Sequence, residues 1–307
     1  MIKLLSSQDL DKKKWDALVS QYTSPSQFFH FSWYLDAVCP KWQGLVYGDY
    51  ELVFPITPQL KLGFTIFVQA IFTREFNFIG KLPSADVLVQ IKQALHSYKF
   101  LYFASSSELV SIDLKTSIRN YQLIKLGLPY DDVFKNYSQN IKRSLKKSVD
   151  AAIEIRSIFE PLTLIDLFRN EKGAEFGHLG KKEYAAILQL MNNGKSADFA
   201  YQIAAYLDGE LIASSFYFVS PTAILFLKGA VNATGKSIGA MVSLHDHVLK
   251  TFSNSHAYFD FGGSNAKGLR EFNLKFGAID MNYLLLSSNN LPWPLNSLFD
   301  KKYKHNA

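Results

Sequence analysis

The pattern of apolar and polar residues is clearest between residues 223 and 277, where strands and helices alternate. Residues Ala223–Val231 (AILFLKGAV) are apolar and bounded by turn residues, which predicts a buried strand. Asn232–Gly239 opens a helix whose apolar positions recur every three or four residues. A short aromatic strand over Ala257–Phe261 and a helix over Lys267–Phe276 follow, and Gly277 ends that helix. Strand–helix–strand with this spacing is a crossover unit, so we expect two parallel strands.

The segment between the first strand and the first helix has the features of an anion site. Backbone N–H groups at a helix N-terminus bind anions, and a lysine there adds positive charge. We predict that donor binding involves Gly235, Lys236, Ser237, Ile238, Gly239 and Ala240. A P-loop NTPase is excluded, because five residues separate Gly229 from Gly235 and that motif requires four. A plain strand–helix connection stays open as the alternative.

Periodicity elsewhere predicts further helices and strands, with an irregular tail. Helices are predicted at 7–20, 32–38, 84–97, 131–147, 162–169 and 182–191. Strands are predicted at 43–47, 51–56, 64–72, 100–103, 121–125, 153–157 and 282–286, with a meander at 199–207, 211–219 and 223–231.

An internal repeat indicates a duplicated fold. Gly80–Ala85 resembles Gly235–Ala240, and Tyr102-Phe103 resembles Tyr258-Phe259, at offsets of 155 and 156 residues. We therefore predict an α/β (α+β) protein of two tandem domains, residues 1–120 and 121–307, with mixed sheets flanked by helices. Pro83 in the first copy lacks an N–H group, so the second domain is expected to hold the donor and the first to shape the acceptor side. Chance similarity of short motifs is the alternative.

Composition restricts the class of protein only loosely. The chain has 307 residues, 33 Lys+Arg against 27 Asp+Glu, and 48% hydrophobic residues, as in soluble globular proteins. The modest positive charge fits an anionic ligand without requiring nucleic acid. Cys39 is the single cysteine, so no disulfide framework or cysteine-based zinc site is expected. With no signal peptide or membrane span in the pattern, we expect a cytoplasmic protein.

Several titratable residues are candidates for chemistry. Asp260 lies at the predicted end of a strand before two glycines, where it is either a catalytic or orienting acid or a turn residue that binds local amides. His178 follows a glycine-containing loop and is either a general base or a solvated histidine. His245 and His247 are two residues apart on a helix and cannot share a metal ion, so no metal site is expected.

A basic helix is predicted around Asn140–Ser148. It carries Lys142, Arg143, Lys146 and Lys147 on one side and apolar residues on the other. This pattern is typical of a solvated amphipathic helix, and it also suits contacts to the phosphates of CoA or an RNA backbone.

The order of the elements resembles the GNAT acyltransferase fold, and several motifs resemble its FemAB-like branch of aminoacyltransferases and acetyltransferases, which has two such domains. The motifs are Phe31–Val38 (FSWYLDAV), Tyr137–Lys147 (YSQNIKRSLKK), Asp208–Ala213 (DGELIA) and Phe259–Ser264 (FDFGGS), the last leading to Gly268-Leu269, Phe272 and Phe276-Gly277. The resemblance covers most of the chain and is stronger after residue 120.

The resemblance implies a bacterial transferase that moves an acyl or aminoacyl group to an amine, with acyl-CoA or aminoacyl-tRNA as co-substrate and no permanently bound cofactor. Two departures count against the peptidoglycan enzymes. Fem enzymes carry Lys where this chain has Asn273, and they insert a helical hairpin for tRNA that is not evident here. A tRNA-dependent aminoacyltransferase acting on a peptide or peptidoglycan precursor, and a non-catalytic binding protein, remain alternatives to an acyl-CoA-dependent N-acyltransferase.

Residue roles follow from this resemblance as expectations. Lys142 and Arg143 would support the donor's phosphates. Asp260, His178 and Lys275 would be catalytic, and Ser264, Lys267 and Arg270 would bind the acceptor.

Overall fold

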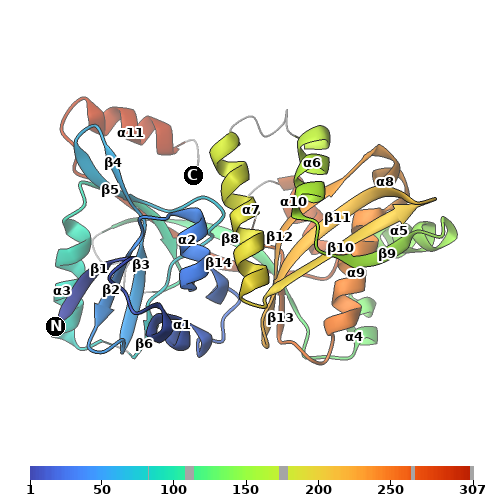
Figure 1. Ribbon diagram of the computed structural model, residues 1–307, viewed down its shortest axis with the longest axis horizontal. Helices are drawn as coiled ribbons and strands as arrows, with labels where there is room; N and C mark the ends of the chain where they lie inside the picture. Colours follow the sequence, from blue (N-terminus) through green and yellow to red (C-terminus); the bar gives the residue numbers. More distant parts are fainter. Residues whose placement is uncertain (82, 108–113, 173–178, 264–266, 305–307) are drawn as a thin grey trace. The chain divides into compact units, whose positions relative to one another are not determined.

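The computed structural model describes residues 1–81, 83–107, 114–172, 179–263 and 267–304 (Figure 1). The chain forms two compact units, which are described separately. Unit 1 comprises Met1–Arg119 and Asn282–Ala307, and unit 2 comprises Asn120–Met281. The C-terminal segment therefore belongs to unit 1, although the sequence analysis grouped it with the second domain. The reason is a strand pairing near the C-terminus that motif order does not reveal.

Unit 1 contains two sheets and flanking helices. Its elements are β1 (Ile2–Ser6), α1 (Lys12–Ser20), η1 (Gln27–His30), α2 (Ser32–Val38), β2 (Gln43–Tyr47), β3 (Leu52–Ile56), β4 (Pro58–Lys61), β5 (Phe64–Val68), β6 (Ile79–Gly80), α3 (Ala85–His96), β7 (Phe100–Ser105) and α11 (Leu295–Lys304). Strands β1-β2-β3-β6 form one sheet, and β4-β5-β7 continue into β14 (Ile279–Asn289) in the other. The pairing of Leu284–Asn289 with Phe100–Ser105 ties the C-terminal segment to unit 1.

Unit 2 is built on one mixed sheet. Its elements are the end of β8 (Lys115–Lys125), α4 (Tyr130–Lys135), α5 (Gln139–Asp150), β9 (Glu154–Ile158), α6 (Pro161–Lys172), α7 (Lys181–Ser196), β10 (Ala200–Leu207), β11 (Glu210–Val219), β12 (Ala223–Val231), α8 (Ala233–Ile238), α9 (Ala240–Phe252), β13 (Tyr258–Asp260) and α10 (Lys267–Leu274). The strand order is β8-β13-β12-β11-β10-β9.

Both units repeat one chain order, which confirms the tandem fold. In each, a strand and helical segments (α1, η1 and α2 in unit 1, α6 and α7 in unit 2) precede antiparallel strands, and a helix then lies between two parallel strands. That helix is α3 between β5 and β7 in unit 1, and α9 between β12 and β13 in unit 2. The predicted parallel crossover is therefore correct, and Tyr102 and Tyr258 occupy the equivalent strands β7 and β13.

Some boundaries differ from prediction because of capping and packing. Helix α1 begins at Lys12 instead of Ser7, since the Asp11 carboxylate accepts hydrogen bonds from the N–H groups of Lys13 and Lys14, both at 3.1 Å. The helix predicted over residues 131–147 is two helices, and Ser138 caps the second of them. The tail predicted as irregular contains α11, whose Phe299 packs into a buried apolar cluster of unit 1.

Candidate functional site

Strand β12 has a partly unpaired edge in unit 2. It pairs with β13 only over Ala223–Leu225 and then runs on to Val231. In the part of the chain that the structure describes, no strand pairs with that continuation on the β13 side. Opposite β11, Phe226 pairs with Tyr217 and Lys228 with Phe216, so Leu227 is a bulged residue. Residues 226–229 are partly exposed. Beyond Leu225, the β13 side of β12 is therefore an edge at which no described strand is added.

The connection after β12 corrects the predicted anion-binding segment. Residues 233–238 form the short helix α8, so several of the predicted donor N–H groups are already used. The Gly235 N–H donates to Asn232 Oδ1 at 2.8 Å, and the Lys236 N–H to the Asn232 carbonyl at 2.9 Å. The Gly239 N–H donates to the Lys236 carbonyl at 3.4 Å. These amides cannot form the expected cradle, because the helical turn consumes them.

The N-terminus of α9 takes over that property. Gly239 has φ +80° and joins the two helices, and no side chain among the described residues caps α9. The first N–H groups of a helix have no intrahelical partner, and in α9 they start with Ala240, whose side chain is buried. Met241, the second residue of α9, is partly exposed. The first N–H groups of α9 thus lie about one helical turn along the chain from the centre of the predicted anion-binding segment.

Helix α5 packs against this connection through Ser144 and Ser148 and carries exposed basic side chains. The Ser148 hydroxyl donates to the Ile238 carbonyl at 2.7 Å, and a Cβ on Gly239 would lie 3.0 Å from Ser144 Cβ. The lysine and arginine side chains on these helices that are exposed are Arg143, Lys146, Lys147 and Lys236. Lys142 is turned back instead, with its Nζ 5.2 Å from the Phe134 ring.

Lys228 is a functional candidate that was not predicted from the sequence. It follows the bulge in β12, is partly buried, and holds its Nζ 3.3 Å from the ring centroid of Phe168 on α6. A cation held over an aromatic face is restrained in position. The signal was present in the sequence, since Lys228 is the single charged residue in the apolar strand AILFLKGAV.

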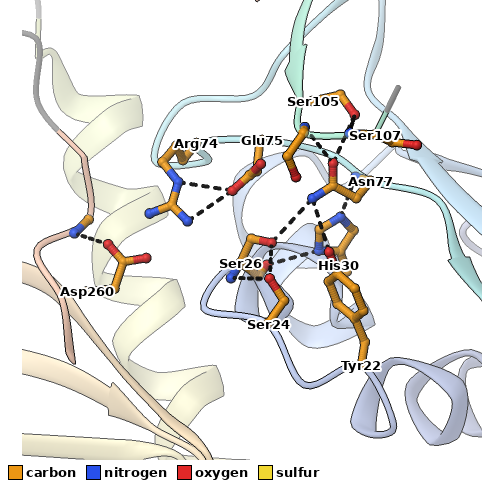
Figure 2. Close-up of polar contacts among 12 residues, drawn as sticks. Tyr22, Ser24, Ser26, His30, Arg74, Glu75, Asn77, Ser105, Ser107 and Asp260 are labelled. Carbon is orange, nitrogen blue, oxygen red and sulfur yellow. Dashed lines mark hydrogen bonds and ion pairs between the residues drawn. The ribbon is translucent and has the colours of Figure 1, made fainter. Parts of the chain in front are cut away.

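Asp260 ends β13 and is fully buried. Its Oδ1 accepts a hydrogen bond from the Gly262 N–H at 2.8 Å (Figure 2). Gly262 has φ +81°, and a Cβ there would lie 2.6 Å from the Phe226 carbonyl oxygen. This local turn bond is the alternative that the sequence left open beside a catalytic role. The bond between Asp260 and Gly262 holds the turn beside Phe226, the first residue of β12 after its pairing with β13 ends.

The other predicted catalytic and acceptor residues lie around α10 or outside the described residues. His178 and Ser264 fall outside, as does the side chain of Lys267. Arg270 forms an ion pair with Asp280, and its Nε donates to Asp280 Oδ1 at 3.1 Å. This pairing lowers the pKa of the Asp280 carboxyl. Lys275 is exposed just beyond the end of α10.

Asn273, which the sequence predicted as a departure from the Fem motif, belongs to a buried amide network. It is 5% exposed, and its Nδ2 donates to Gln122 Oε1 at 3.0 Å. Gln122 is fully buried and donates to Asp280 Oδ1 at 3.0 Å. Because the network is neutral at Asn273, a lysine there would bring an ammonium into a buried site.

His245 is a structural residue of the unit 2 core, as its place on the apolar stripe of α9 predicted. It is 2% exposed, and its Nδ1 lies 3.0 Å from Tyr217 Oη. The rings of Phe226 and Phe261 lie 4.8 and 5.5 Å from its ring. Burial lowers the His245 pKa to about 3, so the ring is neutral at physiological pH.

Unit 1 contains a buried polar network that the sequence did not reveal (Figure 2). The Asn77 N–H donates to His30 Nε2 at 2.7 Å, and Ser105 Oγ donates to Asn77 Oδ1 at 2.9 Å. Burial lowers the pKa of His30 to about 4, which keeps it neutral. Arg74 Nη2 donates to Glu75 Oε1 at 3.0 Å, and both side chains are buried. Burial alone would raise the pKa of Glu75, but Arg74 and nearby hydrogen bonds outweigh it and lower the pKa.

Comparison with known proteins identifies the domain type. Residues 135–272 match the family model for the acetyltransferase (GNAT) domain. No curated protein sequence is detectably similar to the chain. No helix of the described residues is both long and apolar enough to cross a membrane.

Solved structures share the fold at low sequence identity. FemX is 10% identical, with a TM-score of 0.68 over 97% of this chain and 100% of its own. A conserved protein of unknown function from Bacteroides thetaiotaomicron VPI-5482 is 12% identical, with a TM-score of 0.64 over 94% and 100%. A tandem GNAT protein from the clavulanic acid biosynthesis pathway is 10% identical, with a TM-score of 0.55 over 95% and 99%. The fold is thus tandem GNAT-like, and the matched domain indicates an acyltransferase.

Proposed function

We propose that this protein, whose residues 135–272 match a GNAT domain, is an N-acyltransferase that moves an acyl group from an acyl-CoA-type thioester to an amine. The observation that carries the proposal is the unpaired edge of β12 beyond the Leu227 bulge, close in the chain to the uncapped N-terminus of α9. An extended acyl-pantetheine arm can hydrogen-bond to such an edge as an added strand would. The helix N-terminus suits its pyrophosphate.

The charges around α9 support the assignment of the donor to unit 2. Arg143, Lys146 and Lys147 on α5 and Lys236 on α8 are exposed, and α5 packs against the Gly239 connection. Several cations near one helix N-terminus favour a ligand with more than one phosphate. Lys142 has a weaker claim, because it already donates to the Lys135 carbonyl at 3.4 Å.

The reaction requires polarisation of the thioester carbonyl and removal of one proton. The amine nitrogen attacks the carbonyl carbon, a C–N bond forms, the C–S bond breaks, and the proton lost by the amine goes to the thiolate. A backbone N–H at the Leu227 bulge and the Lys228 ammonium would stabilise the negative charge on the carbonyl oxygen. Asp260 would position the adjoining turn, and Lys275 remains a proposed catalytic group. Unit 1 is the proposed acceptor side.

The amide network at Asn273 favours acyl-CoA over aminoacyl-tRNA as donor. The position offers no cation for a phosphate or carboxylate, since Asn273 is buried and bonded to Gln122. We therefore do not propose aminoacyl-tRNA as the donor, and its binding would contradict the proposal.

Calorimetric titration of the full chain with acetyl-CoA tests the proposal. We expect micromolar binding, and a charge-reversed R143E/K236E variant should bind roughly tenfold or more weakly while its melting temperature is unchanged. K13E, an exposed lysine on α1 of unit 1, is the matched control and should bind normally. Equal binding by all three proteins, or binding of charged tRNA and not of acetyl-CoA, would contradict the donor assignment.

A further inference from the structure

Two segments of unit 1 extend beyond the same edge of its second sheet, namely the edge formed by the ends of its strands. The Lys99 N–H donates to the Thr65 carbonyl at 3.3 Å, and the Asn290 N–H donates to the Lys99 carbonyl at 2.8 Å. The start of β5, the start of β7 and the end of β14 therefore lie in a row. The β4–β5 turn, residues 60–63, and the stretch 291–294 that leads into α11 both continue past this row (Figure 1). Strand β7 lies between β5 and β14 and adjacent strands are about 5 Å apart, so the two segments leave the sheet about 10 Å from each other.

The residues at this edge are unusually apolar and exposed. Leu60 is 76% exposed, Leu62 68%, Trp293 81% and Leu298 58%. Beneath them, Ile66, Phe100 and Phe299 form a buried cluster with Phe64, Leu295 and Tyr303 packed on it. The unit's core is thus complete without the exposed set, which we name the edge patch. Exposed tryptophan and leucine side chains that cluster mark interaction surfaces.

Lysines surround the edge patch. Lys61 lies in the β4–β5 hairpin, Lys99 at the start of β7, and Lys301 and Lys302 on α11, and all four are exposed. Helix α11 (Leu295–Lys304) carries one acidic residue, Asp300. Its Oδ1 accepts a hydrogen bond from Asn289 Nδ2 at 2.8 Å. The surface therefore combines apolar side chains with an excess of positive charge.

We propose that the edge patch docks unit 1 reversibly on an anionic membrane surface. Tryptophan favours the interface between lipid headgroups and acyl chains, and lysines near the surface are attracted by anionic lipids. Charge complementarity selects this occupant over a second copy of the chain, because two copies would bring like charges together. The proposal does not depend on the acyl donor or acceptor.

Co-sedimentation of the full chain with vesicles tests the proposal. We expect binding to vesicles of phosphatidylcholine and phosphatidylglycerol in a 2:1 ratio (roughly one-third anionic lipid) and little binding to phosphatidylcholine alone, with loss of binding at high salt. A K61E/K302E variant should bind at least about tenfold more weakly, since each lysine contributes about fivefold. An L62S/W293S variant should also lose binding.

The matched control is Val149→Ser, which removes an apolar side chain 77% exposed on the basic helix α5 of unit 2. It should bind vesicles like the unchanged protein. Binding that persists in both edge-patch variants, or is lost in the Val149 variant, would overturn the proposal. Concentration-dependent dimerisation in sedimentation velocity that L62S/W293S abolishes, without vesicle binding, would identify a second copy as the occupant and also overturn it.

Discussion

Replacement of Gly239 by alanine tests whether the α8–α9 connection positions the donor site. Gly239 has φ +80°, a conformation that costs a residue with a side chain about 1–2 kcal/mol. The new Cβ would also lie 3.0 Å from Ser144 Cβ and 3.1 Å from the Ser144 carbonyl oxygen, so α5 or α9 must shift. Overpacking of this kind costs about 1–3 kcal/mol. The total destabilisation should be roughly 2–5 kcal/mol.

Gly209 provides a matched control for backbone strain. It has φ +84° in the β10–β11 turn, and a Cβ there would meet nothing within 4 Å. Gly209→Ala should cost about 1–2 kcal/mol, and each kcal/mol corresponds to about 2–4 °C of melting temperature. Calorimetry should show weaker acetyl-CoA binding for Gly239→Ala only. Equal destabilisation and unchanged acetyl-CoA affinity in both variants would show that the α8–α9 connection does not position the donor site. If Gly239→Ala does not fold, Ser148→Ala tests the same connection more mildly, because it removes the hydrogen bond from Ser148 to the Ile238 carbonyl.

Three further predictions concern single side chains. The His245 pKa is about 3 in the folded protein and 6.5 ordinarily, so the unfolded state gains a proton first as the pH falls. The free energy of unfolding should therefore fall by about 1.4 kcal/mol per pH unit below pH 6.5, and urea unfolding of His245→Phe should show a weaker dependence of that free energy on pH. Lys228→Met should lower kcat/KM by about 100-fold with the melting temperature unchanged; normal turnover would exclude its role. Asn273→Leu should lower the free energy of unfolding by about 1–3 kcal/mol, because buried Gln122 loses a hydrogen-bond donor. An unchanged free energy in urea unfolding would show that this hydrogen bond does not stabilise the protein.

The sequence predicted the elements with strong periodicity and the order in which they follow. Helix α2 and strands β2 and β12 have the predicted bounds, because apolar spacing and turn residues determine them locally. The parallel pairing of β12 with β13 followed from the length of the crossover. The tandem organisation was predicted from a short repeat and is confirmed by the equivalent chain orders.

Features that depend on tertiary contacts were not predictable. The Ile212 carbonyl would lie 2.5 Å from a Cβ on Gly235, and this tight packing against β11 accompanies the separate helix α8. The buried network of His30 and Asn77 joins residues 47 positions apart, which no local pattern shows. Asn273 was identified only as a departure from the Fem motif, and its bond to Gln122 spans 151 residues. Lys228 could have been found as a lone charge in an apolar strand.

Hydrogen–deuterium exchange of the full chain with and without acetyl-CoA distinguishes a donor site in unit 2 from one elsewhere in the chain. We expect acetyl-CoA to slow exchange at the first N–H groups of α9, from Ala240 onward, and along β12 beyond Leu227. Gly235 and Lys236, whose N–H groups bond to Asn232, should change little. Saturating acetyl-CoA that protects neither α9 nor β12, or that protects only segments of unit 1, would contradict the claim that unit 2 holds the donor.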